Sequence, residues 1–175
     1  MFGNEWRMIP LSVLSVFLLC SCTARTILHG MKNLPEPSGS SSAHQVNVFF
    51  VKGDQDGLKL VPVSRIVSGN DRLQAAVSAL LSGPDEAESG RGLGSEIPRG
   101  TILLSVKRRG TDVELDLSRR FASGGGVESL ETRLEQLRRT VRSAEKWHNV
   151  YLSVEGNRLT IAAGEGIEVH QPINR

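Results

Sequence analysis

Three acidic side chains alternate along one stretch of the sequence and are the residues best placed for acid and base chemistry. Asp112, Glu114 and Asp116 are separated by single apolar residues, so on a β-strand the three carboxylates share one face. Paired carboxylates can act as a general acid and a general base. The same alternation is typical of a half-buried antiparallel strand whose polar face meets water, and we favour that interpretation.

The second candidate for ligand binding is a long segment rich in glycine and acid at residues 85–97. Loops of this length inside a compact domain are uncommon and are often functional. A small-ligand-binding or hydrolytic envelope protein that uses this loop and the acidic face is therefore the alternative to a non-enzymatic function. A surface loop pinned by Leu93 and Ile97 explains the segment equally well.

Other motifs give weaker signals for chemistry. Asp54, Asp56 and Gly57 superficially resemble a calcium loop, but the further ligands and the closing glutamate of an EF-hand are missing. The glycines at residues 124–126 lack the lysine of a phosphate-binding loop. No Ser/His/Asp, Cys/His or metal-ligand grouping occurs at a spacing that supports catalysis. We therefore predict a protein without catalytic residues, metal or cofactor.

The N-terminus has the features of an export signal. Residues 9–19 form an apolar run of the length typical of a signal peptide, and this run is too short to span a bilayer comfortably. Leu19, Ser21 and Cys22 are spaced as in the bacterial lipobox, which they resemble. We predict a signal peptide at residues 1–21 and lipidation of Cys22; an ordinary secretory signal and an uncleaved anchor are the alternatives.

This start implies an extracytoplasmic protein that is anchored by lipid to the bacterial cell membrane. In a cell with two membranes, the sequence does not distinguish the inner from the outer membrane as the site of the anchor. Residues 22–45 contain prolines and a serine-glycine run and are predicted to be a flexible linker. Residues 46–175 then form the folded domain, whose stability must come from packing because both cysteines precede it. The net charge of +2 gives no general attraction to polyanions, so nucleic acid is excluded as a partner.

Apolar periodicity predicts an α+β fold in which two helices pack on a mainly antiparallel, twisted sheet. The first helix is capped by Asn70 or Ser68 and ends before Gly83 and Pro84. The second helix covers residues 127–144 and carries one apolar seam. The expected strands are residues 46–51, covered on both faces, residues 58–67, at an edge because of Pro62, the hairpin of residues 101–108 and 111–117, and residues 150–154 and 159–162, followed by a polar tail at 164–175.

A basic patch is expected on the polar side of the second helix. A solvated face is the interpretation that we favour, because cations suit a helix C-terminus. Anionic lipid head groups, peptidoglycan or an acidic protein partner are the alternatives. The patch consists of Arg133, Arg138, Arg139, Arg142 and Lys146.

Six segments, taken in order, resemble the GerMN domain, a family named for sporulation and germination proteins and found in bacterial lipoproteins. The resemblance covers residues 46–175. The segments are Val48-Phe49-Phe50, Ala79 to Pro84, Gly92 to Thr101, Val113 to Phe121, Gln136 to Thr140 and Val154-Glu155-Gly156.

The resemblance implies a compact α+β module, similar to the ring-building motifs of envelope assemblies, that acts as a non-enzymatic interaction domain. The namesake proteins carry the domain in tandem, whereas this chain has one copy. The expected partner is therefore another envelope protein, in a complex related to sporulation, germination or the cell wall. The candidate interaction residues are Gly83, Pro84, Gly92, Ser95, Ile97, Pro98, Arg138, Arg139 and Arg142.

Overall fold

The computed structural model describes residues 42–55, 57–162 and 166–174, which belong to one compact unit. The predicted signal peptide, Cys22 and the linker up to residue 41 lie outside the described residues, as does Asp56 of the calcium-like loop. The first strand begins at Ala43, so the end of the predicted linker belongs to the sheet. Within the described ranges, no helix has both the length and the apolar character needed to cross a bilayer.

The elements confirm the predicted α+β class with mainly antiparallel pairing. Within the described residues a third, short helix and several short strands join the expected elements. In chain order they are β1 (Ala43–Asp54), β2 (Gly57–Ser68), α1 (Arg72–Leu81), α2 (Glu86–Gly90), β3 (Leu93–Gly94), β4 (Leu103–Arg109), β5 (Asp112–Leu117), the 3-10 helix η1 (Arg119–Ala122), α3 (Val127–Ala144), β6 (Asn149–Val154), β7 (Asn157–Arg158), β8 (Ile161–Ala162) and β9 (Ile167–Glu168).

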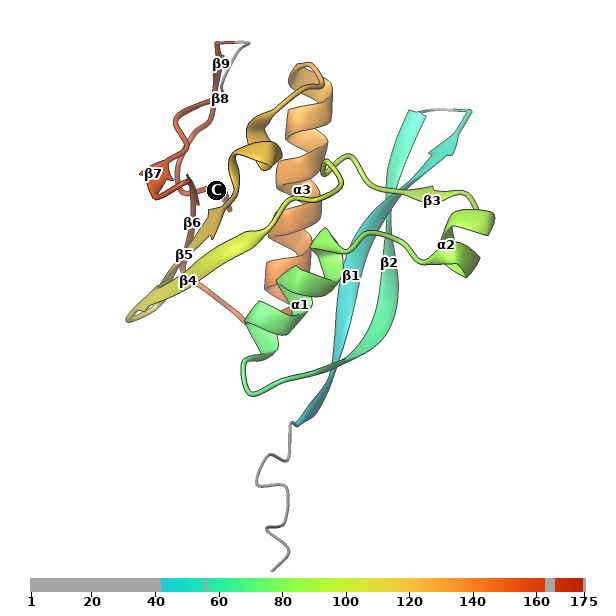
Figure 1. Cartoon of the computed structure of the whole chain (residues 1–175), viewed down its shortest axis with the longest axis horizontal. Helices are drawn as coiled ribbons and strands as arrows, with labels where there is room; N and C mark the ends of the chain where they lie inside the picture. The colour runs from blue at the N-terminus through green and yellow to red at the C-terminus, as the bar shows by residue number, and fades with distance from the viewer. Residues whose placement is uncertain (1–41, 56, 163–165, 175) are drawn as a thin grey trace, which may run out of the picture. The chain divides into compact units, whose positions relative to one another are not determined.

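The strands form separate sheets around the long helix. One sheet has the order β2-β1-β3, a second has the order β4-β5-β6-β7, and β8 pairs with β9. β4 and β5 make the predicted antiparallel hairpin. β5 and β6 run parallel, because α3 carries the chain back between them as a crossover. Figure 1 shows α3 between the β1–β2 ribbon and the sheet that contains β4 and β5.

Polar side chains of α3 close the open edge of β1. The N–H of Phe49 donates to Thr140 Oγ1 at 3.1 Å, and the Phe49 carbonyl accepts from Gln136 Nε2 at 2.9 Å. Ser143 Oγ donates to the Asn47 carbonyl at 2.6 Å. Gln136 and Thr140 are fully buried, so these bonds satisfy backbone groups that water does not reach. The helix thus takes the place of a strand and protects the edge.

β2 forms the opposite edge of the same sheet, as Pro62 predicted. Pro62 lies opposite Phe49 in the ladder. Since the polar backbone groups of Phe49 face α3, the nitrogen of Pro62 faces the outer edge, where the missing N–H costs no ladder bond. On β1 itself, Asn47 is exposed, so the prediction that both faces of this strand are covered is wrong at that position.

A single cluster of buried apolar side chains joins both main helices to the sheets. The buried apolar side chains of α1 are Leu73, Ala76, Val77 and Leu80. The cap of α1 is Asp71, not the predicted Asn70 or Ser68, and its carboxylate accepts from the Gln74 N–H at 3.0 Å. The predicted seam of α3 is wrong at its start, where Val127 is 53% exposed. Arg133 is buried instead, one helical turn before the buried Gln136.

The C-terminal segment docks on β6, against the prediction of a polar tail. Val169 and Ile173 are buried. The side-chain amide of Gln171 accepts from the Leu152 N–H at 3.1 Å and donates to the Leu152 carbonyl at 3.2 Å. Ile173 N–H donates to the Val150 carbonyl at 2.8 Å. This segment therefore substitutes for a neighbouring strand along β6 and belongs to the core.

Candidate functional site

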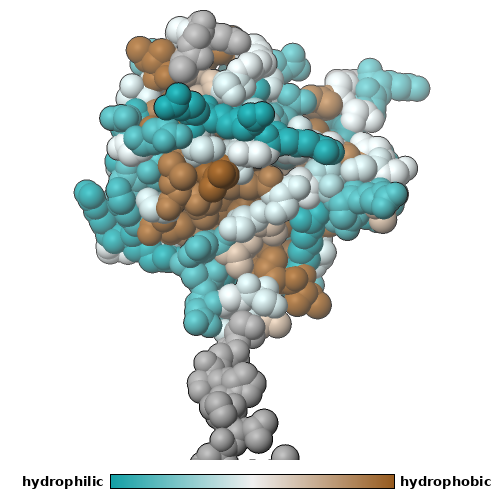
Figure 2. Space-filling view, viewed as in Figure 1, coloured by the Kyte–Doolittle hydropathy of each residue, from teal (hydrophilic) through white to brown (hydrophobic). Residues whose placement is uncertain are grey.

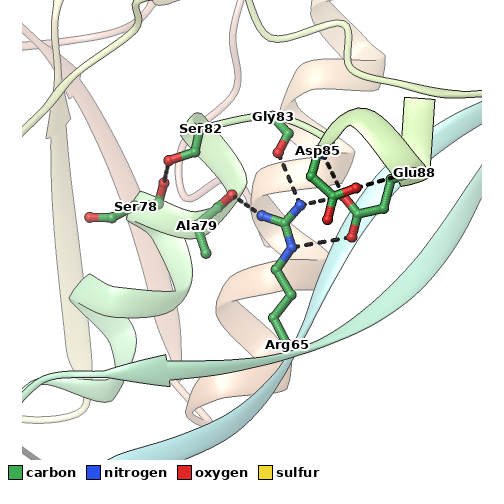
Figure 3. A network of polar contacts seen from close by, with 7 residues as sticks. All are labelled: Arg65, Ser78, Ala79, Ser82, Gly83, Asp85 and Glu88. Carbon is green, nitrogen blue, oxygen red and sulfur yellow. Dashed lines mark hydrogen bonds and ion pairs between the residues drawn. The ribbon is translucent and has the colours of Figure 1, made fainter. Parts of the chain in front are cut away.

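One guanidinium holds the corner that follows α1. Arg65 on β2 donates from Nη1 to the Ala79 carbonyl at 3.0 Å and from Nη2 to the Gly83 carbonyl at 3.1 Å, groups that the end of a helix leaves without partners. The same guanidinium pairs with the carboxylate of Glu88 (Figure 3). Its central carbon lies 4.9 Å from the ring centre of Phe50, a cation–π distance.

The start of α2 completes this network. Asp85 accepts from the Glu88 N–H at 2.7 Å, and the Glu88 carboxylate accepts from the Asp85 N–H at 2.8 Å, which is a capping box. Gly83 has a φ of +79°, a left-handed conformation that glycine adopts at low cost. Two of the predicted interaction residues, Gly83 and Pro84, therefore lie in a corner whose contacts are internal to the fold.

The rest of the long segment is also fastened to the domain. Gln136 Oε1 accepts from the Glu96 N–H at 2.9 Å, and Ser129 Oγ donates to Glu96 Oε2 at 2.7 Å. Ser95 Oγ accepts from Gln136 Nε2 at 3.2 Å, and Ile97 is 4% exposed. Ser95 and Ile97, predicted as interaction residues, thus face the interior and α3.

Gly92 and Pro98 lie at turns on the surface of this segment. Gly92 is exposed and precedes β3, which pairs with Val51 and Lys52 of β1. Pro98 is half-buried, and its carbonyl accepts from both the N–H and the hydroxyl of Thr101. The segment of residues 85–97 therefore contains α2 and β3 and is fixed at several points.

The acidic face of β5 is a network of satisfied carboxylates. All three carboxylates point toward β6 or the turn that follows it. Asp112 accepts from Asn149 at 3.0 Å, Glu114 accepts from Ser153, and Asp116 accepts from the Gly156 N–H at 2.9 Å.

Glu114 remains ionised in this network. The hydrogen bond from Ser153 lowers the pKa of Glu114, with a further contribution from Arg158 at 3.5 Å, while burial opposes the shift. A carboxyl group that acts as an acid at neutral pH needs a raised pKa, so the shift at Glu114 is opposite to that requirement. A hollow of about 260 Å³ beside Glu114 is lined by Lys107, Arg109 and Tyr151 among others, so side chains of both charge signs border it.

Arg133 does not belong to the basic patch. It is 3% exposed, and its guanidinium donates to the carbonyls of Phe121 at 2.9 Å, Ser123 at 3.2 Å and Gly124 at 2.5 Å. Carbonyl acceptors from the chain ahead of α3 thereby anchor the start of the helix. The prediction that Arg133 is on the polar side of α3 is wrong, because the buried face of α3 includes polar residues as well as the apolar seam.

Arg138 and Arg139 lie in a shallow groove of about 760 Å³. The groove runs along the outer face of α3, between the start of β2 and the C-terminal segment. Apolar side chains from all three parts line it, with charged side chains around them. The apolar members are Leu58, Leu60, Leu134, Val169 and Ile173, and the charged members are Lys59, Glu131, Glu135, Arg138, Arg139 and Glu168 together with His170.

The groove is not uniformly basic. Glu135 pairs with both Arg138 and Arg139, the latter at 2.6 Å. Arg139 also lies 5.9 Å from the ring centre of Phe49. Arg142 lies outside the groove and lines a separate hollow with Lys146 and others. The structure therefore divides the predicted patch between two places on α3.

A further surface feature is apolar. Figure 2 shows a broad hydrophobic area on the face of the molecule over β4. Ile102 and Leu104 are 60% and 46% exposed there, and β4 is the outer strand of its sheet. Exposed apolar area of this kind is typical of protein contact surfaces. The register of β4 against β5 shifts between Leu103 and Ser105, and such a bulge disfavours continued pairing along the edge.

The described residues form an α+β domain in which the three carboxylates of β5 are hydrogen-bonded within the fold. The Germane family, described as "Sporulation and spore germination", matches residues 47–160. The chain belongs to this family, which confirms the resemblance seen in the sequence. A search of the curated proteins gives no significant match.

Solved structures agree with the family assignment. The tandem GerMN domains of the sporulation protein GerM from Bacillus subtilis match with a TM-score of 0.56 and 21% identity, over 79% of this chain and 49% of that chain. The first GerMN domain of the same protein matches with a TM-score of 0.56 and 15% identity, over 73% and 95%. This chain thus spans about half the length of the tandem structure, and the likeness shows the fold.

Sequence reasoning missed the polar side chains that hold the corner after α1 and close the edge of β1. Arg65 and Glu88 are distant in the sequence, and nothing in their spacing links them. Gln136, Thr140 and Ser143 had a signal, because steps of four and three residues place them on one stripe of a helix. A polar stripe beside an apolar seam is the pattern expected where a helix packs against the open edge of a strand.

Proposed function

We propose that the protein is a lipid-anchored, extracytoplasmic envelope protein whose GerMN-type domain binds another envelope protein without catalysing a reaction. The groove along α3 is the observation that carries the proposal. Its apolar floor with a rim of paired charges matches the usual anatomy of a protein contact surface, an apolar centre inside a polar rim. The family assignment supports a role in sporulation or germination, and the apolar area over β4 offers additional contact surface.

The lipid anchor rests on the sequence around Cys22. Cells are grown with an alkyne fatty acid, and the label on the full chain is measured after purification. We expect Cys22→Ala to abolish the label, while Cys20→Ala, its matched control two residues away, retains it. Equal labelling of wild type and Cys22→Ala would contradict the anchor.

Protein binding is tested by photo-crosslinking in cells. A photoreactive amino acid replaces Leu58, an exposed residue of the groove floor, or Ile66, an exposed apolar residue of the same strand that does not line the groove. We expect discrete adducts to an envelope protein from position 58 and none from position 66. Uncrosslinked monomer from both positions would refute protein binding at the groove.

A small-ligand-binding function is the second candidate, and the hollow beside Glu114 favours it. Glu114 has a lowered pKa, so it suits an anionic binding group better than a general acid. Binding of anionic lipid or peptidoglycan through Arg138, Arg139 and Arg142 is a third candidate. Strong salt dependence of cosedimentation with anionic vesicles or wall material would support the third candidate.

A further inference from the structure

The charges that α3 itself contributes to the groove are ordered, while Lys59, which also lines the groove, pairs with Asp54. Glu131 lies toward the start of the helix, and Arg138 and Arg139 lie about two turns later. At 1.5 Å per residue this separation is about 10–12 Å along the helix axis. Glu135 is shared by both arginines, so this end of the groove keeps an excess of positive charge. The other end carries Glu131 as an additional acid.

The floor between the two ends is apolar and is supplied by three parts of the chain. Leu134 comes from α3, Leu58 and Leu60 come from β2, and Val169 and Ile173 come from the C-terminal segment. Leu58 is 49% exposed, so the floor is accessible from solvent. A ligand that covers this floor removes apolar surface from water, which is the main favourable contribution to association.

Charge complementarity therefore selects the occupant, and this step rests on the proposed function. We propose that the groove binds a short extended segment of a partner protein in which apolar residues lie between an acidic end and a basic end. The acidic end lies at Arg138 and Arg139, and the basic end lies at Glu131. An extended chain advances about 3.3 Å per residue, so three or four residues span the distance between the two charged ends.

The same charges argue against other occupants. An anionic lipid surface or a uniformly acidic polymer would bring negative charge to Glu131 and Glu168 as well as to the arginines, and like charges brought together oppose binding. Arg138 and Arg139 already have an anionic neighbour in Glu135. A segment with both signs of charge meets each end of the groove with the opposite sign.

The test uses the full chain in mild detergent and three labelled eight-residue peptides with the same apolar centre. One peptide has an acidic end and a basic end, the second has two acidic ends, and the third has two basic ends. Fluorescence anisotropy gives each Kd. We expect the acid-and-base peptide to bind wild type about tenfold more tightly than the other two, equivalent to about 1.4 kcal/mol.

Charge reversal makes the result specific. R138E/R139E leaves α3 with acidic side chains at both ends of the groove, so the preference should change to the peptide with two basic ends. R91E/R99E, a control with the same change in net charge at exposed arginines that do not line the groove, should keep the wild-type ranking. Leu58→Asp should raise the Kd of all three peptides at least fivefold, while Ile66→Asp should leave each Kd unchanged. Circular dichroism confirms that each variant is folded.

Several outcomes would overturn the inference. Equal affinity of wild type for the three peptides, no binding of any peptide, or an unchanged ranking in R138E/R139E would each do so. Binding of anionic vesicles that is lost in R138E/R139E, without peptide binding, would assign the groove to a membrane. If adducts at position 58 persist while the peptide ranking fails, only the charge order is wrong; if the adducts are absent too, the proposed function fails with it.

Discussion

Replacing Arg65 by methionine removes the guanidinium that joins α1, α2 and β2, and it tests whether the corner is a structural device. Two hydrogen bonds from the charged group to carbonyls are lost, each worth about 1.5–3 kcal/mol when the donor is charged. Glu88, whose side chain is 5% exposed, loses its cation, and breaking a buried pair costs about 3–5 kcal/mol. These losses overlap because one group makes all the contacts.

We therefore expect Arg65→Met to lower the free energy of unfolding by about 3–5 kcal/mol, below the simple sum because Arg65 is 20% exposed and water can replace part of the lost contacts. Urea unfolding followed by circular dichroism measures the change. Arg65→Lys should recover less than half of the loss, because an ammonium cannot reproduce the planar fork that reaches two carbonyls and a carboxylate.

The double variant Arg65→Met, Glu88→Leu separates the ion pair from the other contacts. Removing the uncompensated carboxylate should make the double variant less destabilised than the sum of the two single variants. Arg99→Met, at an exposed arginine, is the control and should stay within about 0.5 kcal/mol of wild type. A loss below about 1 kcal/mol for Arg65→Met would refute the structural role of the corner.

Three further comparisons test other supports of the fold. Gly125→Ala should destabilise more than Gly124→Ala in urea unfolding, because both glycines have positive φ but only at Gly125 would the added Cβ collide with the Arg133 guanidinium. Gln136→Leu should cost about 2 kcal/mol or more, since it leaves the Phe49 carbonyl buried without this donor; a neutral result would contradict the sealing of the β1 edge. Glu114 has a folded pKa below the ordinary 4.5, so its contribution to stability is complete above the unfolded pKa and disappears as the pH falls through the folded pKa. Urea midpoints between pH 6 and 3 should therefore fall more steeply for wild type than for Glu114→Gln.

The parts of the fold that sequence reasoning predicted are those set by local periodicity. Residues 73–80 repeat apolar side chains at helical spacing, and Gly83 and Pro84 end the helix where the structure ends it. The alternation along residues 112–117 likewise predicted β5, but the expected water-exposed acidic face is wrong at Asp116, which is buried. These signals depend on neighbours within one or two turns, so they are readable from a single sequence.

The parts that were missed depend on contacts between distant residues. Arg65 and Glu88 meet only because β2 passes beside the corner after α1. The polar tail docks because Gln171 imitates a peptide group against Leu152, and no local pattern marks this role. Arg133 was assigned to a basic face because its carbonyl partners lie in the segment before α3. Sequence periodicity does not predict the path of that segment. Hydrogen bonds and ion pairs between distant residues are therefore what local sequence patterns do not predict.

α3 presents two different stripes of side chains, one toward β1 and one toward the groove. Its inner stripe, which includes Gln136 and Thr140, seals β1 and is fully buried, whereas its outer stripe lines the groove with Glu135 and Arg139. Residues three or four apart share a face and those two apart do not, so neighbouring positions along one helix serve different roles. Substitutions on the outer stripe should change peptide preference with a loss of stability below about 1 kcal/mol, as exposed ion pairs usually do.

Substitutions on the inner stripe should have the converse effect. Thr140→Val keeps the shape but leaves the Phe49 N–H without its acceptor, so it should lower stability by about 1–3 kcal/mol while the ranking of peptides stays that of wild type. Arg139→Gln should alter peptide affinity with a nearly unchanged urea midpoint. If Thr140→Val changed the ranking of peptides, or if Arg139→Gln unfolded the domain, the two faces of the helix would not be independent. Residues of the groove could then not be substituted without loss of the fold.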